Sequence, residues 1–159
     1  MPEYGDGKDY QNSKYYRYVD RLGPSLYREM ARRKIENIEN FYDFAMKQMG
    51  SESNFGLSDP ATQGFNFGGV KPGTKYTKYD SVNDYTKYWV DMIMRMYPNA
   101  PLATTPEEYV NALLKNIEGN PYFEDSADAY LKNIKYAKTL EKYMKLYRKD
   151  HPEAFETEP

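Results

Sequence analysis

The feature that most constrains this fold is a hydrophobic repeat in residues 38–56 that runs into a carboxyl group. Apolar side chains recur there at steps of three and four residues, at Ile38, Phe41, Ala45 and Met49. This is the spacing of one face of an amphipathic helix. The same steps next reach Glu52 and then Phe55. The sequence therefore predicts a helix whose interior-facing side carries a carboxyl group near its end.

A carboxyl group on a buried helix face has a specific chemical consequence. Burying the charged form costs several kcal/mol unless it is paired, so a buried Glu tends to hold its proton. Raising the pKa of Glu52 from about 4.3 to about 6 requires roughly 2.3 kcal/mol. A carboxylic acid that is protonated near neutrality is what a glycosidase needs to protonate a leaving oxygen. Alternatively, Gly50 caps the helix and Glu52 is a solvated loop residue; the periodicity leaves both interpretations open.

Composition narrows the chemistry that is available to the chain. Its 159 residues, 40% hydrophobic and 29% charged, favour one globular domain. The net charge of -2 gives no basic field, so no nucleic-acid partner is expected. Without cysteine, and with His151 as the one histidine, a thiolate or multi-histidine metal site is excluded. A Ser-His-Asp triad is not expected, because His151 lies in the tail. We expect no metal and no cofactor, which leaves carboxylates and tyrosines for acid–base chemistry.

The chain contains 18 tyrosines. Tyrosine both stacks on sugar faces and hydrogen-bonds to sugar hydroxyls, although most of the 18 are expected simply to fill half-buried positions. No stretch is long and apolar enough to span a bilayer, so no membrane insertion is expected. The first residues also lack the basic segment and apolar run of a signal peptide.

The remaining pattern predicts six helices and a small β-hairpin. The helices are expected near residues 15–22, 24–34, 38–52, 81–97, 105–117 and 126–148, with a break at Gly23-Pro24 between the first two. Residues 56–81 have no helical period. There, a Lys-Pro-Gly-Thr turn at 71–74 lies between aromatic segments at 65–67 and 76–79, which predicts the hairpin. Residues 1–12 are expected to form a flexible arm, and residues 150–159 an acidic, frayed tail.

The last predicted helix carries a row of lysines, at Lys132, Lys135, Lys138, Lys142, Lys145 and Lys149. One interpretation is a solvated helix face. The other is a surface that contacts an anionic polymer or the bacterial wall.

Several segments, taken in order, are similar to motifs of one enzyme family. Residues 52–56 (Glu-Ser-Asn-Phe-Gly) resemble a Glu-Ser-Gly-aromatic-Gly signature, and residues 66–71 resemble an Asn-Leu-Phe-Gly-Ile-Lys segment. Residues 79–82 match the end of the family's hairpin. Later elements are matched by residues 105–109 (Thr-Pro-Glu-Glu-Tyr), Tyr122, Asp125 and Tyr130. On these segments the chain resembles glycoside hydrolase family 73, the bacterial and phage endo-β-N-acetylglucosaminidases of the lysozyme-like superfamily.

The resemblance implies a mainly α, lysozyme-like domain at residues 13–149, with the β-hairpin lobe flanking a glycan-binding cleft. It implies hydrolysis of the β-1,4 bond after N-acetylglucosamine in peptidoglycan, with Glu52 as the general acid. Tyr122 matches a tyrosine that helps to position or stabilise the reacting sugar, and Tyr130 is the second match for that role. The substrate-binding residues implied by the resemblance are Phe55, Asn66, Phe67, Tyr79 and Tyr130.

The second carboxylate is where this sequence departs from the family. The family usually has an acidic residue in its hairpin, but residues 65–79 contain no Asp or Glu. Asp80 is our candidate, with Asp59 as the other near substitute, because Asp84 is expected to cap a helix. An inverting base lies about 6.5–9.5 Å from the acid. Without one, the substrate's own acetamido group could act as the nucleophile.

Two other functions remain open at this stage. A muramidase or lytic transglycosylase shares the acid Glu but leaves different sugar ends. A non-catalytic wall-binding or virion structural protein could use the same scaffold. The expected partners are peptidoglycan glycan strands and other virion or wall components. The expected place of action is the bacterial cell wall, for a phage-encoded or virion-associated lysin or for an excised domain of an exported protein.

Overall fold

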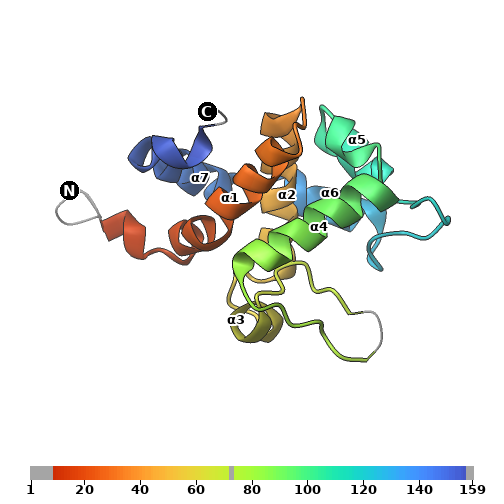
Figure 1. The fold of residues 1–159 in the computed structure, drawn as a ribbon. Helices are drawn as coiled ribbons and strands as arrows, with labels where there is room; N and C mark the ends of the chain where they lie inside the picture. The colour runs from red at the N-terminus through yellow and green to blue at the C-terminus, as the bar shows by residue number, and fades with distance from the viewer. Residues whose placement is uncertain (1–8, 72–73, 157–159) are drawn as a thin grey trace.

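The computed structural model describes residues 9–71 and 74–156, and it is built almost entirely from helices (Figure 1). The α-helices are α1 (Lys14–Arg32), α2 (Ile38–Glu52), α3 (Asp59–Gly64), α4 (Val82–Met96), α5 (Pro106–Ala112), α6 (Ala127–Lys135) and α7 (Lys138–Asp150). Short 3-10 helices are η1 (Asp9–Asn12), η2 (Ala100–Leu102) and η3 (Pro152–Phe155). The described residues contain no β-strand. The mainly α class that the sequence predicted is therefore right.

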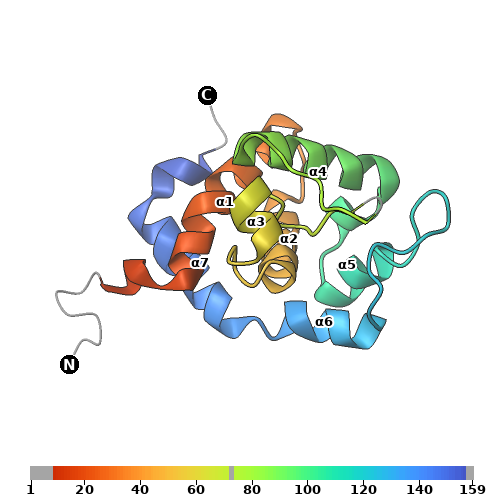
Figure 2. The same ribbon diagram turned by 90° about the horizontal axis from the view of Figure 1, so that it is seen from below.

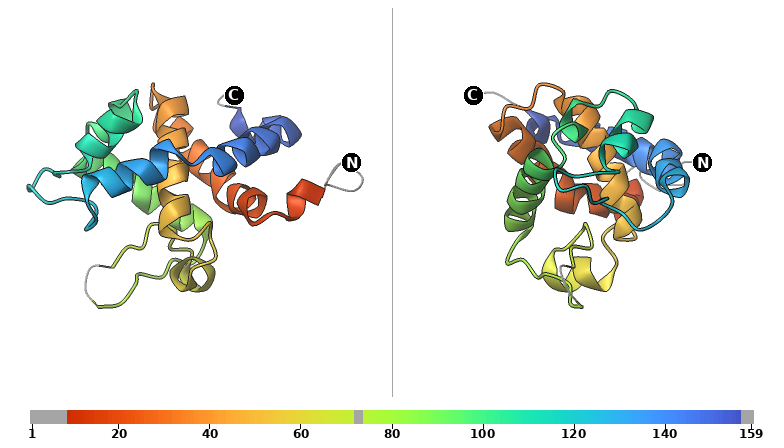
Figure 3. Two further views of the ribbon diagram at one scale, coloured as in Figure 1. Left: turned by 180° about the vertical axis from the view of Figure 1, so that it is seen from behind. Right: turned by 90° about the vertical axis from the view of Figure 1, so that its right-hand side faces the viewer.

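Helix α2 is the central element, and the other helices surround it (Figure 2). Its predicted apolar stripe is buried, since Phe41, Ala45 and Met49 are completely inaccessible to solvent. Seen from behind, α6 crosses α2 (Figure 3), and the two helices are in contact. The helix continues through Gly50 and ends at Glu52. The alternative in which Gly50 caps the helix is therefore wrong, and Glu52 is the last helical residue.

Gly50 has a packing role inside α2. A Cβ atom at this position would lie 3.2 Å from both Leu140 of α7 and Phe55, which is tighter than ordinary van der Waals contact. The absent side chain lets these two apolar groups pack directly against the α2 backbone.

The predicted break at Gly23-Pro24 is wrong, because α1 runs through both residues without interruption. Proline removes one backbone hydrogen bond from a helix, but burial of Leu22 and Leu26 on either side of it favours the continuous helix. Gly23 is needed for close packing. A Cβ atom there would lie 2.6 Å from the Tyr42 hydroxyl of α2.

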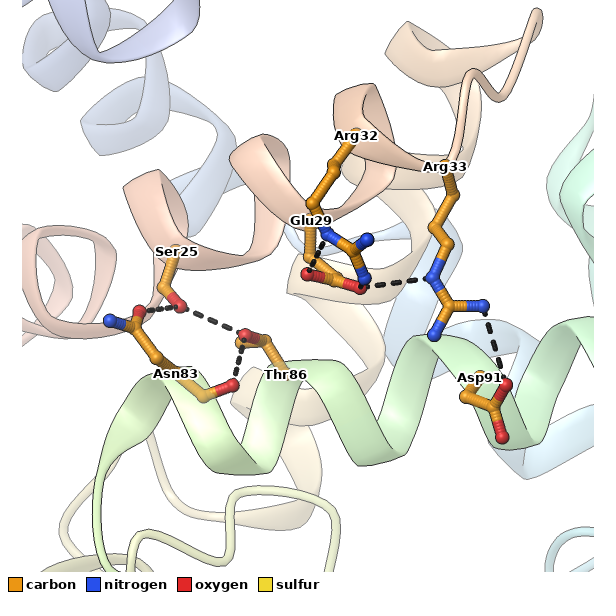
Figure 4. A network of polar contacts seen from close by, with 7 residues as sticks. All are labelled: Ser25, Glu29, Arg32, Arg33, Asn83, Thr86 and Asp91. Carbon is orange, nitrogen blue, oxygen red and sulfur yellow. Dashed lines mark hydrogen bonds and ion pairs between the residues drawn. The ribbon is translucent and has the colours of Figure 1, made fainter.

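Helices α1 and α4 are fixed to each other by buried polar contacts (Figure 4). Ser25 donates a 2.6 Å hydrogen bond to Asn83 at the start of α4. The almost fully buried Glu29 accepts bonds from Arg32 and Arg33, and Arg33 continues to Asp91 of α4 at 3.3 Å. Burial alone raises the pKa of Glu29, but the two arginines outweigh it and hold that pKa below its usual range. Glu29 therefore stays charged and paired in the α1–α4 interface.

The predicted β-hairpin lobe is absent from the described residues, and residues 65–71 and 74–80 form loops instead (Figure 1). Thr77 donates its backbone N–H to Val70, and Tyr79 donates to Gly64. Between these two bonds the Asn66 side chain replaces the backbone hydrogen bonds that paired strands would form. It donates to the Val70 and Thr77 carbonyls and accepts from the Val70 N–H. The segment is thus held by these two backbone hydrogen bonds and by the amide of Asn66. The predicted turn at 71–74 includes residues outside the described ranges.

The helix count also differs from the prediction. Helix α3 was not predicted, although Ser58 caps it and Pro60 lies in its first turn. The single helix expected at 126–148 is instead α6 and α7, separated at Tyr136 and Ala137. The two halves pack on different partners, since α6 contacts α5 and α2 whereas α7 contacts mainly α1. A bend lets both halves reach the core.

The two chain ends are more ordered than expected where the structure describes them. Tyr10 of η1 and Tyr16 of α1 both donate to the Asp150 carboxylate at the end of α7, at 2.8 Å. Phe155 of η3 is buried against Tyr27 and Tyr42, with ring centroids 5.2 and 5.7 Å away. Residues 9–12 and 150–156 therefore belong to the folded body. The rest of the expected arm and tail lies outside the described residues.

The docking of Phe155 predicts a measurable stability loss. We expect Phe155→Ala to lower the free energy of unfolding by roughly 3 kcal/mol, because it empties a buried aromatic site. Urea denaturation followed by circular dichroism measures this change. The control is Glu153→Ala in the same short helix, whose exposed side chain should change stability by less than about 0.5 kcal/mol. Equal effects for the two variants would show that the C-terminal segment does not dock.

Candidate active site

Glu52 opens onto a cleft of about 580 Å³. Its lining residues come from the end of α2, the loop at 68–71, α4, residues 122–125 and α6. The main lining side chains are Glu52, Lys71, Tyr76, Tyr88, Met92, Tyr97, Tyr122, Phe123, Glu124, Asp125, Tyr130 and Asn133. The cleft is thus rich in tyrosine and contains both acidic and basic groups.

The Glu52 carboxyl is turned into the protein although the residue as a whole is only half-buried. Its Oε1 atom is buried and has no hydrogen-bond partner among the residues that the structure describes. Its Oε2 atom accepts a 3.1 Å bond from the Tyr130 hydroxyl. Burial raises the pKa of Glu52 to about 8, against a smaller lowering by Tyr130. The carboxyl group is therefore mainly protonated at neutral pH.

Tyrosine side chains form the surroundings of this carboxyl group. The charged form of Glu52 raises the pKa of five of them, Tyr18, Tyr85, Tyr109, Tyr122 and Tyr130. Burial is the larger cause in each case, and all five pKa values lie well above the ordinary range. These hydroxyls therefore keep their protons and act as neutral hydrogen-bonding groups.

Tyr122 and Tyr130 are held in place by further contacts. The Tyr122 hydroxyl accepts a 2.9 Å bond from the Trp89 indole of α4. The Tyr130 ring stacks on Phe123, with centroids 4.2 Å apart and planes at 15°. Ring contacts of this kind add to the energy of burial. Both cleft tyrosines therefore have fixed orientations toward Glu52.

Gln48 supports the site from within α2, one helical turn before Glu52. It is almost fully buried, and its Oε1 accepts a bond from the Tyr109 hydroxyl. Its Nε2 is a buried donor without a partner among the described residues. The hydrophobic stripe gave no signal for Gln48. Tyr109 was quoted only as part of a motif, so the sequence analysis missed both.

Three of the predicted site residues come together. Glu52, Tyr122 and Tyr130 line the same cleft although they are far apart in sequence. The hydrogen bond between Tyr130 and Glu52 makes Tyr130 the closer partner of the two tyrosines.

Four predicted substrate-binding residues do not line this cleft. Phe55 packs against Tyr15 at a centroid distance of 4.6 Å, and Phe67 is completely buried in the core. Asn66 is buried and fully occupied with the loop backbone. Tyr79 packs on other tyrosines, and burial raises its pKa to about 12. These residues shape the loop and the core beneath the cleft.

The predicted second carboxylate, Asp80, is exposed and also lies outside the cleft lining. Asp59, at the start of α3, is exposed and outside the lining as well. The acidic residues that line the cleft with Glu52 are Glu124 and Asp125. The sequence pattern predicted this carboxylate beside the expected hairpin. Asp125 was predicted only as part of a motif, and Glu124 was not predicted.

In the described part of the chain, no group of three His, Asp or Glu residues is placed to hold a metal ion. None of the described helices has both the length and the apolar character needed to cross a membrane. No family model, no curated protein and no solved structure matches the chain. The chemistry of the cleft is therefore inferred from its own residues.

The raised pKa of Glu52 predicts how Glu52→Gln changes stability with pH. The folded state holds a proton that the unfolded state, with a Glu pKa near 4.3, releases. The wild type therefore loses stability as the pH rises from about 4 to about 8, and the glutamine variant does not. The free energy of unfolding of the variant, relative to that of the wild type, should therefore rise by a few kcal/mol between pH 4.5 and pH 8. Urea denaturation at the two pH values measures this difference.

The exposed Glu36 provides the control, because Glu36→Gln should have the same free energy of unfolding as the wild type at both pH values. If the free energies of unfolding of Glu52→Gln and the wild type changed equally with pH, the Glu52 carboxyl would be charged in the folded protein.

Proposed function

We propose that this protein is a peptidoglycan hydrolase that cleaves the β-1,4 bond after N-acetylglucosamine, with Glu52 as the general acid. The observation that carries the proposal is a buried, proton-holding carboxyl group at the floor of an open, tyrosine-lined cleft. General acids of glycosidases have this property, because a raised pKa keeps the proton available at neutral pH. The resemblance of residues 52–56 and 105–109 to glycoside hydrolase family 73 supports the same proposal.

In the proposed reaction, Glu52 gives its proton to the glycosidic oxygen while the bond from this oxygen to the anomeric carbon breaks. Positive charge then develops on the sugar ring. The Tyr130 hydroxyl donates to Oε2 of Glu52 and so orients the carboxyl group. The tyrosine and Phe123 side chains offer faces and hydroxyls for neutral sugar rings.

The reaction also needs a group that handles the attacking water. We propose that Glu124 or Asp125 takes this role, because both line the cleft with Glu52 and Asp80 does not. Water would add to the anomeric carbon on the face opposite the leaving oxygen, and its proton would pass to the carboxylate.

A lytic transglycosylase is the second candidate. It is favoured by the absence of any Asp or Glu among residues 65–79 of the sequence, because internal attack by a sugar hydroxyl needs no water-activating carboxylate. A muramidase would use the same acid on the neighbouring bond. A non-catalytic wall-binding or virion protein is the remaining candidate, but a binding scaffold has no need of an acid with a raised pKa. The proposed place of action is the bacterial cell wall.

Turbidity loss of purified peptidoglycan tests the role of Glu52. We expect the wild type and Glu36→Gln to clear the suspension and Glu52→Gln to be slower by roughly 10²-fold or more, the usual contribution of a general acid. Equal rates for Glu52→Gln and the wild type would remove Glu52 from the mechanism. No clearing by any of the three on several wall types would favour the binding scaffold.

Mass spectrometry of the released fragments identifies the bond in the same experiment. Reducing N-acetylglucosamine ends are expected. Reducing muramic ends would indicate a muramidase, and anhydro-muramic ends a transglycosylase.

The second carboxylate can be tested by three matched substitutions. We expect either Glu124→Gln or Asp125→Asn to lower hydrolysis by roughly 10²-fold, and Asp80→Asn to leave it within about twofold. The rates are measured on soluble glycan fragments with the anomeric form of the product followed by NMR. Full activity of both cleft variants would support the transglycosylase, and a loss restricted to Asp80→Asn would restore our first candidate.

A further inference from the structure

Helix α7 carries four exposed lysines on one face, at Lys138, Lys142, Lys145 and Lys149. With about 100° per residue, these positions fall within a sector of roughly 60° around the helix axis, and they extend over about 16 Å. They line a shallow groove of about 420 Å³ together with Glu141 and Leu146. We refer to the four lysines as the lysine face. Helix α7 itself lies at the edge of the helical assembly, away from α5 (Figure 2).

The acidic residues of α7 are engaged with other elements and leave the lysine face strongly positive. Glu141 accepts a 2.8 Å bond from the buried Lys47 of α2. Lys47 is also the first cause of the lowered Glu141 pKa, ahead of Lys138 and Lys145. Asp150 accepts bonds from tyrosines near the N-terminus. Within the described residues, Lys138, Lys145 and Lys149 form no ion pair.

The placement of these lysines is unfavourable for the helix itself. Lys138 is the first residue of α7, where the helix dipole disfavours a cation. Like charges three and four residues apart repel one another, and the lysine face contains only such spacings. The overall charge of the chain is -2, so this positive surface is local. Alternating charges would stabilise a solvated helix face more than a row of lysines does, as in the Lys132–Asp128 pair of α6.

We propose that the lysine face binds a linear phosphodiester polymer. Lysine ammonium groups bind phosphate as point charges, whereas planar carboxylates are better matched by arginine. The one arginine of α7 is turned away, since Arg148 pairs with Glu39. A row of charges about 16 Å long suits an extended chain better than a single anion. The proposal does not rest on the hydrolase activity, because the groove lies outside the cleft.

Fluorescence anisotropy with labelled poly(glycerol phosphate) and the full chain tests the proposal. Neutralising three to four phosphates predicts a slope of about -2 to -3 for the logarithm of the binding constant against that of the salt concentration. The variant Lys138→Gln/Lys145→Gln/Lys149→Gln should bind at least tenfold more weakly. The control Lys87→Gln/Lys115→Gln/Lys132→Gln has the same net charge and should stay within twofold.

A thermal melt accompanies the binding assay to verify that the lysine-face variant is folded at the assay temperature. Absence of binding by the wild type at low salt, or an equal loss in the control, would overturn the proposal.

Single-stranded DNA with the same number of phosphates forms the second arm. The aromatic residue of α7 nearest to the lysines, Tyr143, is half-buried and stacked on Tyr15 with centroids 5.5 Å apart. We therefore expect no gain from base stacking, and DNA should bind no more tightly than poly(glycerol phosphate). A tenfold preference for DNA would identify a nucleic-acid surface instead and contradict the base-free polymer proposed here.

Discussion

Burial of one carboxyl group at the end of the central helix is the constraint on which the rest of this structure depends. The apolar side chains of α2 must be shielded from water by neighbouring helices. The same helices bury the carboxyl group of Glu52. Tyr130 arrives from α6, Tyr109 from α5, and Tyr18 from α1. These neutral groups desolvate the carboxyl group without offering a positive charge to ionise it. The raised pKa of Glu52 is therefore a property of the whole helical assembly.

The site is built at a cost to stability. Four buried side-chain polar atoms lack partners in the described part of the molecule, and two of them, Glu52 Oε1 and Gln48 Nε2, belong to the site. Such atoms are destabilising wherever they occur. Natural proteins depart from full polar satisfaction mainly at functional sites. The stacking of Phe123 on Tyr130 fixes the ring whose hydroxyl bonds to Glu52.

The sequence predicted the parts of the structure that depend on local pattern. The α2 stripe lies as expected, and α4 and α5 begin within a residue of their predicted starts, where Ser81 and Thr105 cap them. The errors arose where tertiary contacts override local signals. Gly23-Pro24 looked like a break but lies within a buried helix, and Asn66 replaces the strand pairing expected around it. The walls of the cleft could not be predicted, because they unite segments far apart in sequence through packing that no local spacing encodes.

The most direct test of this account is a titration of the Glu52 carboxyl group itself. Carbon-13 NMR of protein labelled at glutamate side-chain carboxyls, with Glu52→Gln to assign the resonance, would follow its protonation from pH 4 to pH 10. We predict a midpoint near pH 8 for Glu52. A midpoint below about pH 5, within the ordinary range of glutamate, would mean that the carboxyl is charged at neutral pH. The proposed general acid would then have no proton to give.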